Sequence, residues 1–298
     1  MNSIRYSRSQ QIVLNVVMIL LSLSCILPFI LLITSSITDE ATLVTYGYSF
    51  WPKKISLEAY NYIASAKNTI VRAYGMTVLV TVIGTFGNVM MTIFMGYLLS
   101  KKDAPGRTFL SFFLFFTMLF NGGMVPSYIV WTELFHIRDT IWALILPNLF
   151  LGAYNVILIR TYFTSSIPDG IIEAARVDSC SEVGILFKIV LPLSKPIIAT
   201  ITLFSGLAYW NDWINGLYYV ARKPELYTIQ NVLNVMVSNA QFLQTANNIS
   251  NLQSLNIAVP TMGIRMAIAV IAVAPILIIY PFFQKYFVKG IVVGGIKG

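Results

Sequence analysis

The sequence predicts an all-α membrane protein, and both its composition and its long charge-free stretches support that fold class. Hydrophobic residues make up 57% of the 298-residue chain, whereas Asp, Glu, Lys and Arg together make up 11%. An average soluble domain carries about 25% charged residues, so this chain has too few charges to cover its surface in water. Several charge-free stretches reach the roughly 18 to 20 residues that a helix needs to cross a bilayer. Lipid is therefore expected to replace water over much of the surface.

Six transmembrane helices are predicted, and together they form one transmembrane domain over 12–289. The first apolar run is too long for a signal peptide and has no small-residue cleavage site after it, which predicts a retained first helix. The charge-free run 196–211 is the shortest. Residues 191–193 are expected to extend it, with the charged end of Lys195 reaching toward the membrane surface. The predicted spans are 12–37, 73–100, 108–132, 140–160, 190–212 and 266–284.

The distribution of Lys and Arg predicts the orientation of these spans. Six crossings place both termini on one side, and positive charge is denser in the segments on that side, so both termini are expected in the cytoplasm. Residues 1–11 form the predicted cytoplasmic N-terminus. Repeated glycines predict a flexible cytoplasmic tail over 290–298.

The stretch 226–264 contains no Asp, Glu or Lys but is not predicted to enter the membrane. Asn, Gln, Ser and Thr are frequent in it, and amide groups without partners do not cross hydrocarbon. We expect a long, water-exposed external loop with a short helix around 229–237.

Several classes of function are excluded by missing residues. One histidine and two cysteines cannot build a His-rich or Cys-rich metal site, and no glycine-rich loop followed by Lys occurs that would hold ATP phosphates. The basic residues flank apolar runs instead of forming a patch, which argues against nucleic acid as a partner. An ion-coupled carrier or an intramembrane enzyme would need ionisable or catalytic side chains at mid-membrane depth, and the predicted spans have none there.

The most informative segment is the predicted cytoplasmic stretch 167–196, between the fourth and fifth spans. Pro168 suits the first turn of a helix, and Asp169 and Glu173 complement the positive end of that helix. Ser181 is suited to cap a second short helix before prolines redirect the chain. Two short helices on the membrane face are therefore predicted, with an ordinary polar loop as the alternative.

This segment resembles the EAA signature of binding-protein-dependent ABC importer permeases. In that family the first short helix is a coupling helix, which lies in a groove of a cytoplasmic ATPase and transmits its closure to the membrane helices. The resemblance implies a type I ABC importer permease fold with such a coupling helix. It assigns ATPase coupling to Glu173, Ala174, Ala175, Asp178, Ser179, Phe187, Leu191 and Pro192.

Two positions of this segment depart from the family pattern. Ser179 stands where the family has glycine, and if the backbone there keeps a left-handed conformation, the serine costs about 1 to 2 kcal/mol. Cys180 stands where alanine is usual, which replaces one small side chain by another.

Other motifs resemble carbohydrate-uptake permeases, most nearly the maltose-type second permease and its oligosaccharide branch. These motifs are NGGMVP at 121–126, WNDW at 210–213, and the tail from QKYFVKG at 284–290 to Lys297 and Gly298. The resemblance implies a multi-pass subunit of the bacterial cytoplasmic membrane that imports a sugar, expected to be an oligosaccharide. Its implied partners are a second permease subunit in a heterodimer, two ATP-binding cassette subunits, and an extracytoplasmic solute-binding protein or lipoprotein. The chain itself would bind no cofactor, since the ATPase subunits bind ATP and Mg.

The third predicted span contains the first candidate for the substrate pathway. Asn121, Gly122 and Gly123 interrupt its apolar run ahead of Pro126, which predicts a broken or kinked helix. Lining of a cavity and helix packing through small residues explain this break equally well. In the second span, packing is the favoured role of Gly84, Gly87 and Gly96.

The outer end of the fifth predicted span contains the second candidate. Trp210 and Trp213 suit an interfacial aromatic belt, which is one explanation. Asn211 and Asp212 between them suit contact with sugar hydroxyls, which is the other. Asp212 is equally suited to cap a helix end.

The external loop provides candidates for contact with the binding protein that the resemblance implies. Amide side chains can exchange hydrogen bonds with sugar hydroxyls, although simple solvation explains them equally well. The candidates are Asn239, Gln241, Gln244 and Asn247.

Overall fold

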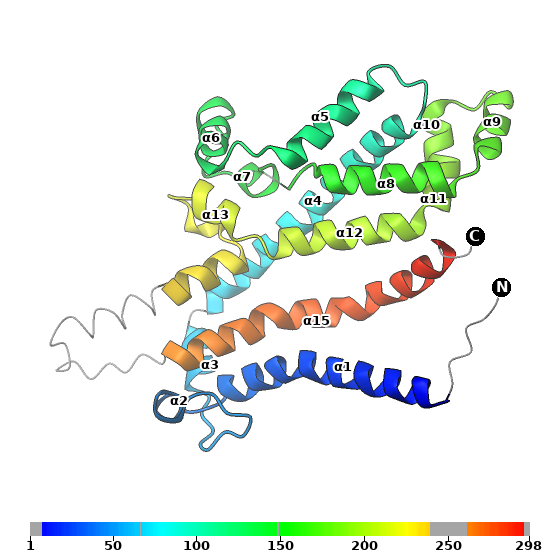
Figure 1. Cartoon of the computed structure of the whole chain (residues 1–298). Helices are drawn as coiled ribbons and strands as arrows, with labels where there is room; N and C mark the ends of the chain where they lie inside the picture. Colours follow the sequence, from blue (N-terminus) through cyan, green and yellow to red (C-terminus); the bar gives the residue numbers. More distant parts are fainter. Residues whose placement is uncertain (1–7, 66, 148, 239–260, 295–298) are drawn as a thin grey trace. The chain divides into compact units, whose positions relative to one another are not determined.

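The computed structural model confirms the all-α class for the part of the chain that it describes (Figure 1). Within that part, the only β-type contact is an isolated bridge between Thr38 and Ile55. The described residues are 8–65, 67–147, 149–238 and 261–294.

The chain divides into two compact units, and the first comprises 1–67 and 235–276. Most of its long first helix consists of apolar residues whose side chains are exposed, as expected of a helix surrounded by lipid. A hydrogen bond of 2.8 Å between the hydroxyls of Ser36 and Tyr60 joins this helix to the third. The helices are α1 (Arg8–Ser36), α2 (Glu40–Tyr46), α3 (Glu58–Ser65) and the beginning of α15 (Thr261–Gly294).

The carboxylate of Glu40 anchors the beginning of α15 in this unit. Its two oxygens accept hydrogen bonds of 2.8 Å each from the backbone N–H groups of Met262 and Gly263. The first N–H groups of a helix have no partner within the helix, and the helix dipole favours a negative charge beside them. Glu40 therefore fixes the residues at which α15 begins.

The second unit comprises 68–234 and 277–298 and contains most of the helices. Its elements up to the predicted coupling segment are α4 (Lys67–Ser100), α5 (Arg107–Leu119), α6 (Met124–Ile129), the π-helix η1 (Val130–Leu134), α7 (Trp142–Ile145) and α8 (Ala153–Ser166). Its later elements are α9 (Asp169–Val177), α10 (Glu182–Ile185), the π-helix η2 (Leu186–Val190), α11 (Leu191–Leu193), α12 (Lys195–Trp210), α13 (Ile214–Tyr219), the 3-10 helix η3 (Pro224–Leu226) and the end of α15. The chain is also helical over 229–238, which confirms the short helix expected there.

Glycines of α4 allow its neighbours to approach closely. A Cβ atom at Gly84 would lie 2.5 Å from the ring of Tyr209, and one at Gly96 would collide with Ile159. A Cβ atom at Gly87 would similarly lie 2.7 Å from the ring of Phe150. The predicted packing role of these glycines is therefore confirmed.

The range 140–160, expected as one span, is divided into two helices. It is helical at α7 and again from Ala153, and the intervening turn contains Pro147 and Gly152, which disfavour a continuous helix. The side-chain amide of Asn88 donates to the carbonyl oxygens of Leu149 at 2.6 Å and Phe150 at 3.3 Å. Side chains of other helices thus satisfy backbone groups that the broken helix leaves open.

Length and composition identify fewer unbroken spans than the six predicted. Among the described residues, α1 and α4 are each long and apolar enough to cross a membrane, and Met262–Ile278 is a shorter apolar helix. Two further pairs of helices are each bent at a short break. The first pair is α5 with α6 and η1, bent by 120°, and the second is α10–α11 with α12, bent by 85°. The count rises to four if each pair forms one span. The count of six therefore stays a prediction.

The C-terminal helix is longer than predicted. Instead of ending near 284, α15 continues through Gly294, so the tail predicted as flexible is helical at 290–294. A glycine within a helix costs only about 1 kcal/mol relative to alanine, which the surrounding apolar residues of the helix can offset.

Candidate functional site

The first short helix of the predicted coupling segment presents one face to solvent and one to the core. Glu173 and Ala174 in α9 are exposed, whereas Ala175 is buried in an apolar cluster with residues of α4, α8, η2 and α12. Val177, the last residue of α9, is 84% exposed. An exposed valine on a helix of nine residues leaves an apolar surface that a partner protein could cover.

The turn after α9 has the left-handed backbone conformation that the sequence left open for Ser179. Ser179 has a φ of 59°, in the left-handed region that favours glycine. The N–H of Ser179 donates to the carbonyl of Arg176 at 3.0 Å, and that of Cys180 donates to the carbonyl of Ala175 at 2.9 Å. This pair of bonds is the Schellman arrangement of a helix C-terminus, in which one residue must be left-handed. Asp178, exposed, directly precedes that residue.

The second half of the segment is packed on α4. Ser181 caps α10 as predicted, since its hydroxyl accepts from the N–H of Gly184 at 3.1 Å. The ring of Phe187 meets that of Phe94 edge-on, with centroids 6.3 Å apart. Leu191 is half-buried against the apolar cluster, and Pro192 is exposed. We refer to residues 168–193 as the coupling hairpin.

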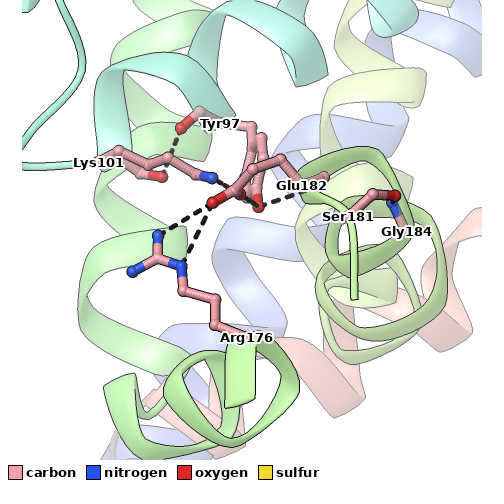
Figure 2. Close-up of polar contacts among 7 residues, drawn as sticks. Tyr97, Lys101, Arg176, Ser181, Glu182 and Gly184 are labelled. Atoms are coloured by element: carbon pink, nitrogen blue, oxygen red, sulfur yellow. Dashed lines mark hydrogen bonds and ion pairs between the residues drawn. The ribbon is translucent and has the colours of Figure 1, made fainter. Parts of the chain in front are cut away.

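Four polar side chains meet where the coupling hairpin contacts the end of α4 (Figure 2). The hydroxyl of Tyr97 donates to Glu182 Oε2 at 2.9 Å, and Lys101 forms an ion pair with the same carboxylate. Arg176 approaches Glu182 Oε1 with both Nε and a terminal nitrogen, at 3.3 Å each. The ammonium of Lys101 also lies 4.3 Å from the centroid of the Tyr97 ring. One carboxylate of α10 thus binds groups from α9, α4 and the loop that follows α4.

The charges of this cluster orient the hairpin more than they stabilise it. The side chain of Glu182 is 52% exposed, and ion pairs at such sites contribute about 0 to 1 kcal/mol. Ile159, Ile185 and Ile201 in the adjacent apolar cluster are fully buried, and each contributes about 1.5 to 3 kcal/mol. Apolar packing therefore decides whether the hairpin folds against α4.

The NGG motif forms the predicted break in the third span. The helix α5 ends at Leu119 and α6 begins at Met124, with Gly123 at a φ of 85°. The side chain of Asn121 accepts from the N–H of Gly123 at 2.9 Å, which closes the turn. Gly122 is exposed, like its two neighbours. In the described part of the chain, no hydrogen bond or ring contact joins this motif to the tryptophan motif at 210–213.

The two tryptophans of the second motif differ in burial. Trp213 is 41% exposed, but Trp210 is 7% exposed and lies beside Tyr74, with ring centroids 6.4 Å apart. The indole N–H of Trp210 is buried without a hydrogen-bond partner in the described structure. A lipid-facing belt position does not fit Trp210, because belt residues place their polar edge at the wet interface.

Asp212 acts as a helix cap. Its Oδ1 accepts from the N–H groups of Ile214 at 3.1 Å and Asn215 at 3.3 Å, at the start of α13. The side chain of Asn211, exposed, donates to the carbonyl of Leu207 at 2.9 Å. Asp212 therefore has the helix-capping role predicted from the sequence as an alternative to sugar contact.

The proposed binding-protein contacts lie outside the described residues. They are Asn239, Gln241, Gln244 and Asn247.

Comparison with protein families identifies the class of protein. Residues 89–293 match the model of the family described as "Binding-protein-dependent transport system inner membrane component". The chain belongs to this family. The matched range includes the coupling hairpin and both candidate pathway motifs.

Relatives in this permease family agree over nearly the full length of the chain. Protein LplC of Bacillus subtilis (strain 168) is 40% identical over 92% of this chain and 90% of its own length. The polygalacturonan/rhamnogalacturonan transport system permease protein YtcP of the same organism is 39% identical over 94% of this chain and 96% of its own length.

A solved structure has the same fold. It is a chain of a bacterial ABC transporter involved in the import of the acidic polysaccharide alginate, 30% identical to this chain. The match has a TM-score of 0.77 and covers 95% of this chain and 99% of the other. The chain is accordingly a multi-pass membrane permease component of an ABC importer, and it is a transport component and not an enzyme. Membership of this family implies an ATPase, a binding protein and a second permease as partners.

Sequence reasoning missed the polar cluster around Glu182. Tyr97 and Glu182 are 85 positions apart, and no periodic pattern relates residues at that separation. The one available signal was an acid directly after the cap Ser181, which helix-dipole stabilisation explains without any partner.

Proposed function

We propose that this permease imports an oligosaccharide, and that separate ATPase subunits drive it through the coupling hairpin. The observation that carries the proposal is the surface of α9, on which Glu173 and Ala174 are exposed while the opposite side holds Ala175 in the core. A partner that grips the exposed side moves a helix whose other side is packed on the transmembrane helices. Rigid-body movement of an ATPase would thereby reach the membrane-spanning part.

The substrate proposal rests on the relatives. The alginate importer and the polygalacturonan/rhamnogalacturonan permease are both named for the transport of polysaccharides, and oligosaccharides are fragments of such polymers. We propose the same chemical class for this chain, delivered by an extracytoplasmic solute-binding protein or lipoprotein. The complex would contain one second permease subunit and two ATP-binding cassette subunits.

The membrane arrangement follows from the same proposal. Six spans with both termini in the cytoplasm place the coupling hairpin on the side where ATP is available. Positive charge denser on that side supports this orientation. In this arrangement α5 with α6 and η1 would count as one bent span, and the fifth span would be 190–212, as predicted from the sequence.

The test uses the assembled complex in proteoliposomes with its binding protein. Ala174→Cys should form a crosslink with an ATPase subunit, and Glu173→Lys should reduce uptake of oligosaccharides released from polygalacturonan and alginate while the protein stays in the membrane. Asp103→Lys, at an exposed carboxylate of the α4–α5 loop, is the matched control. Unchanged uptake by Glu173→Lys, together with no crosslink from Ala174→Cys, would refute coupling through α9.

Trp210 is the proposed substrate contact of the pathway. Its buried indole N–H lacks a partner in the described structure, and a sugar hydroxyl would supply an acceptor in a conformation that opens the pathway to this N–H. Trp210→Phe keeps an aromatic ring and removes the N–H, so it should raise the sugar concentration needed for half-maximal uptake. A change in expression level alone would contradict the contact.

A further inference from the structure

We propose that Glu182 is a positioning residue that ties the coupling hairpin to the cytoplasmic end of α4. Movement of the hairpin would then reach α4 directly, in addition to α8 and α12, which flank the hairpin in the chain. This inference rests on the proposed coupling function and specifies the path by which the movement enters the membrane-spanning part.

The first link closes the hairpin itself. Arg176 stands in the last turn of α9 and Glu182 in the first turn of α10, on either side of the left-handed Ser179. Both contacts of the Arg176 guanidinium to Glu182 Oε1 measure 3.3 Å. The two short helices are thus joined across the turn, so they are expected to move as one body.

The second link attaches this body to α4. Tyr97 lies one turn before the end of α4, is 9% exposed, and donates to Glu182 at 2.9 Å. Lys101, directly after the last residue of α4, pairs with the same carboxylate. Because one carboxylate accepts from both, its position sets the distance between α10 and the end of α4.

The third link carries the movement along α4. This helix is continuous over 34 residues, and Asn88 at its middle accepts from the hydroxyl of Ser205 in α12 at 2.6 Å. An intact helix moves as a rod, so displacement of its end is passed to the region of Asn88. Glu182 is thus placed to link the hairpin with a helix that is remote from it in sequence.

The apolar contacts alone do not fix this attachment. Phe94 and Phe187 meet edge-on, and the buried aliphatic residues around them determine that the segments stay together. Such contacts have no direction and tolerate sliding, whereas charged hydrogen bonds fix relative position. Loss of Glu182 should therefore leave the fold intact and loosen the attachment.

Spin labels on both sides of the link test this directly in the assembled complex. One label is placed at Lys102→Cys beside the end of α4, and the other at Gly170→Cys in the first turn of α9. A side chain at Gly170 meets no atom within 4 Å, and Lys102 is exposed. The native Cys25 and Cys180 are first replaced by Ser. The distance between the labels is measured by electron paramagnetic resonance without nucleotide and with ATP and vanadate.

In the parent complex the distance distribution should be the same in both nucleotide states, because the hairpin and the end of α4 move together. In Glu182→Ala the distribution should shift or broaden when ATP and vanadate are added. Glu225→Ala, at an exposed carboxylate of η3, should behave like the parent. A parent distance that changes with nucleotide, or a Glu182→Ala distance that does not, would overturn the inference.

Two further measurements complete the test. If Glu182→Ala fails to assemble, Tyr97→Phe removes only the phenolic O–H and should show a smaller shift of the same kind; no shift would count against the link. In Tyr97→Phe/Glu182→Ala the effect should equal that of Glu182→Ala alone, since the hydroxyl acts through Glu182. The Ala174→Cys crosslink is recorded in parallel in complexes without the spin-label cysteines. If it forms while the distances contradict the link, only this inference fails. If it is absent and Glu173→Lys leaves uptake unchanged, the coupling proposal fails.

Discussion

At the scale of single residues, the hairpin turn holds a serine in the left-handed conformation that favours glycine. Ser179 adopts a φ of 59° because the helix end before it needs a left-handed residue to satisfy its carbonyl groups. The three non-glycine residues with positive φ in the described structure are His136, Asp139 and Ser179. Of these, Ser179 lies in the segment proposed to receive the ATPase.

Replacing Ser179 by Gly should stabilise the chain. Glycine removes the steric cost of the left-handed conformation, and part of this gain is lost to the greater freedom of the unfolded glycine, so the net gain is about 0.5 to 1 kcal/mol. Thermal unfolding of the purified complex measures it as a higher melting temperature. Ser179→Ala keeps the strain and should show no gain. Equal melting temperatures for the Gly and Ala variants would contradict the strain.

Asp139 provides a residue whose contribution depends on pH. The N–H of Arg222, at 2.9 Å from Oδ1, and that of Ala221 at 2.7 Å lower the pKa of Asp139 despite the opposing effect of burial. A lowered pKa means that the ionised side chain stabilises the fold above the usual Asp pKa, and that this is lost as the pH falls through the lowered value.

Asp139→Asn should therefore unfold at a lower temperature than the parent at pH 7, and the two should converge as the pH falls below the usual Asp range. Melting curves from pH 7 to pH 3 check this, with Asp103→Asn as a control at an exposed carboxylate. A difference that stays constant with pH would show that the charge of Asp139 is not the cause.

At the scale of elements, the packing of α4 against α8 depends on a missing side chain. A Cβ atom at Gly96 would overlap the side chain of Ile159, which is fully buried. Gly75 in the same helix has no atom within 4 Å of the corresponding position. The two glycines thus occupy one helix but differ in their surroundings.

Alanine substitutions at these two glycines should have opposite effects. Gly96→Ala should destabilise the protein by about 1 to 3 kcal/mol through overpacking. Gly75→Ala should stabilise it by about 0.5 to 1 kcal/mol, because alanine has the higher helix propensity and nothing is displaced. Melting temperatures of the two variants provide the measurement, and changes of the same sign in both would contradict the packing of α4 on α8.

The sequence predicted those elements whose signals are local. The break at Asn121 to Gly123 and the cap at Ser181 each depend on neighbouring residues, and the structure contains both. The left-handed conformation at Ser179, which the sequence left conditional, is also present. The division of the fourth predicted span was not foreseen, because hydropathy reports the length of an apolar run and not whether its backbone is helical. The turn there is stabilised by distant side chains, including the amide of Asn215, which donates to the carbonyl of Pro147 at 3.0 Å.

At the scale of the whole molecule, the chain is a permease component of an ABC importer and not an enzyme. Composition predicted a membrane protein, and the motif at Glu173 to Pro192 indicated the family to which the chain belongs. Distant contacts such as Tyr97 to Glu182 become visible only in the folded chain. Together they describe an all-helical permease component whose second unit carries the coupling hairpin.

Uptake into proteoliposomes determines whether separate ATPase subunits drive this permease. Vesicles containing the complete complex, with binding protein and ATP, should accumulate oligosaccharides released from polygalacturonan or alginate, and vesicles containing this chain and its partner permease without the ATPase subunits should not. Concentrative uptake in the absence of ATPase subunits, driven by an ion gradient or by nothing added, would contradict the account.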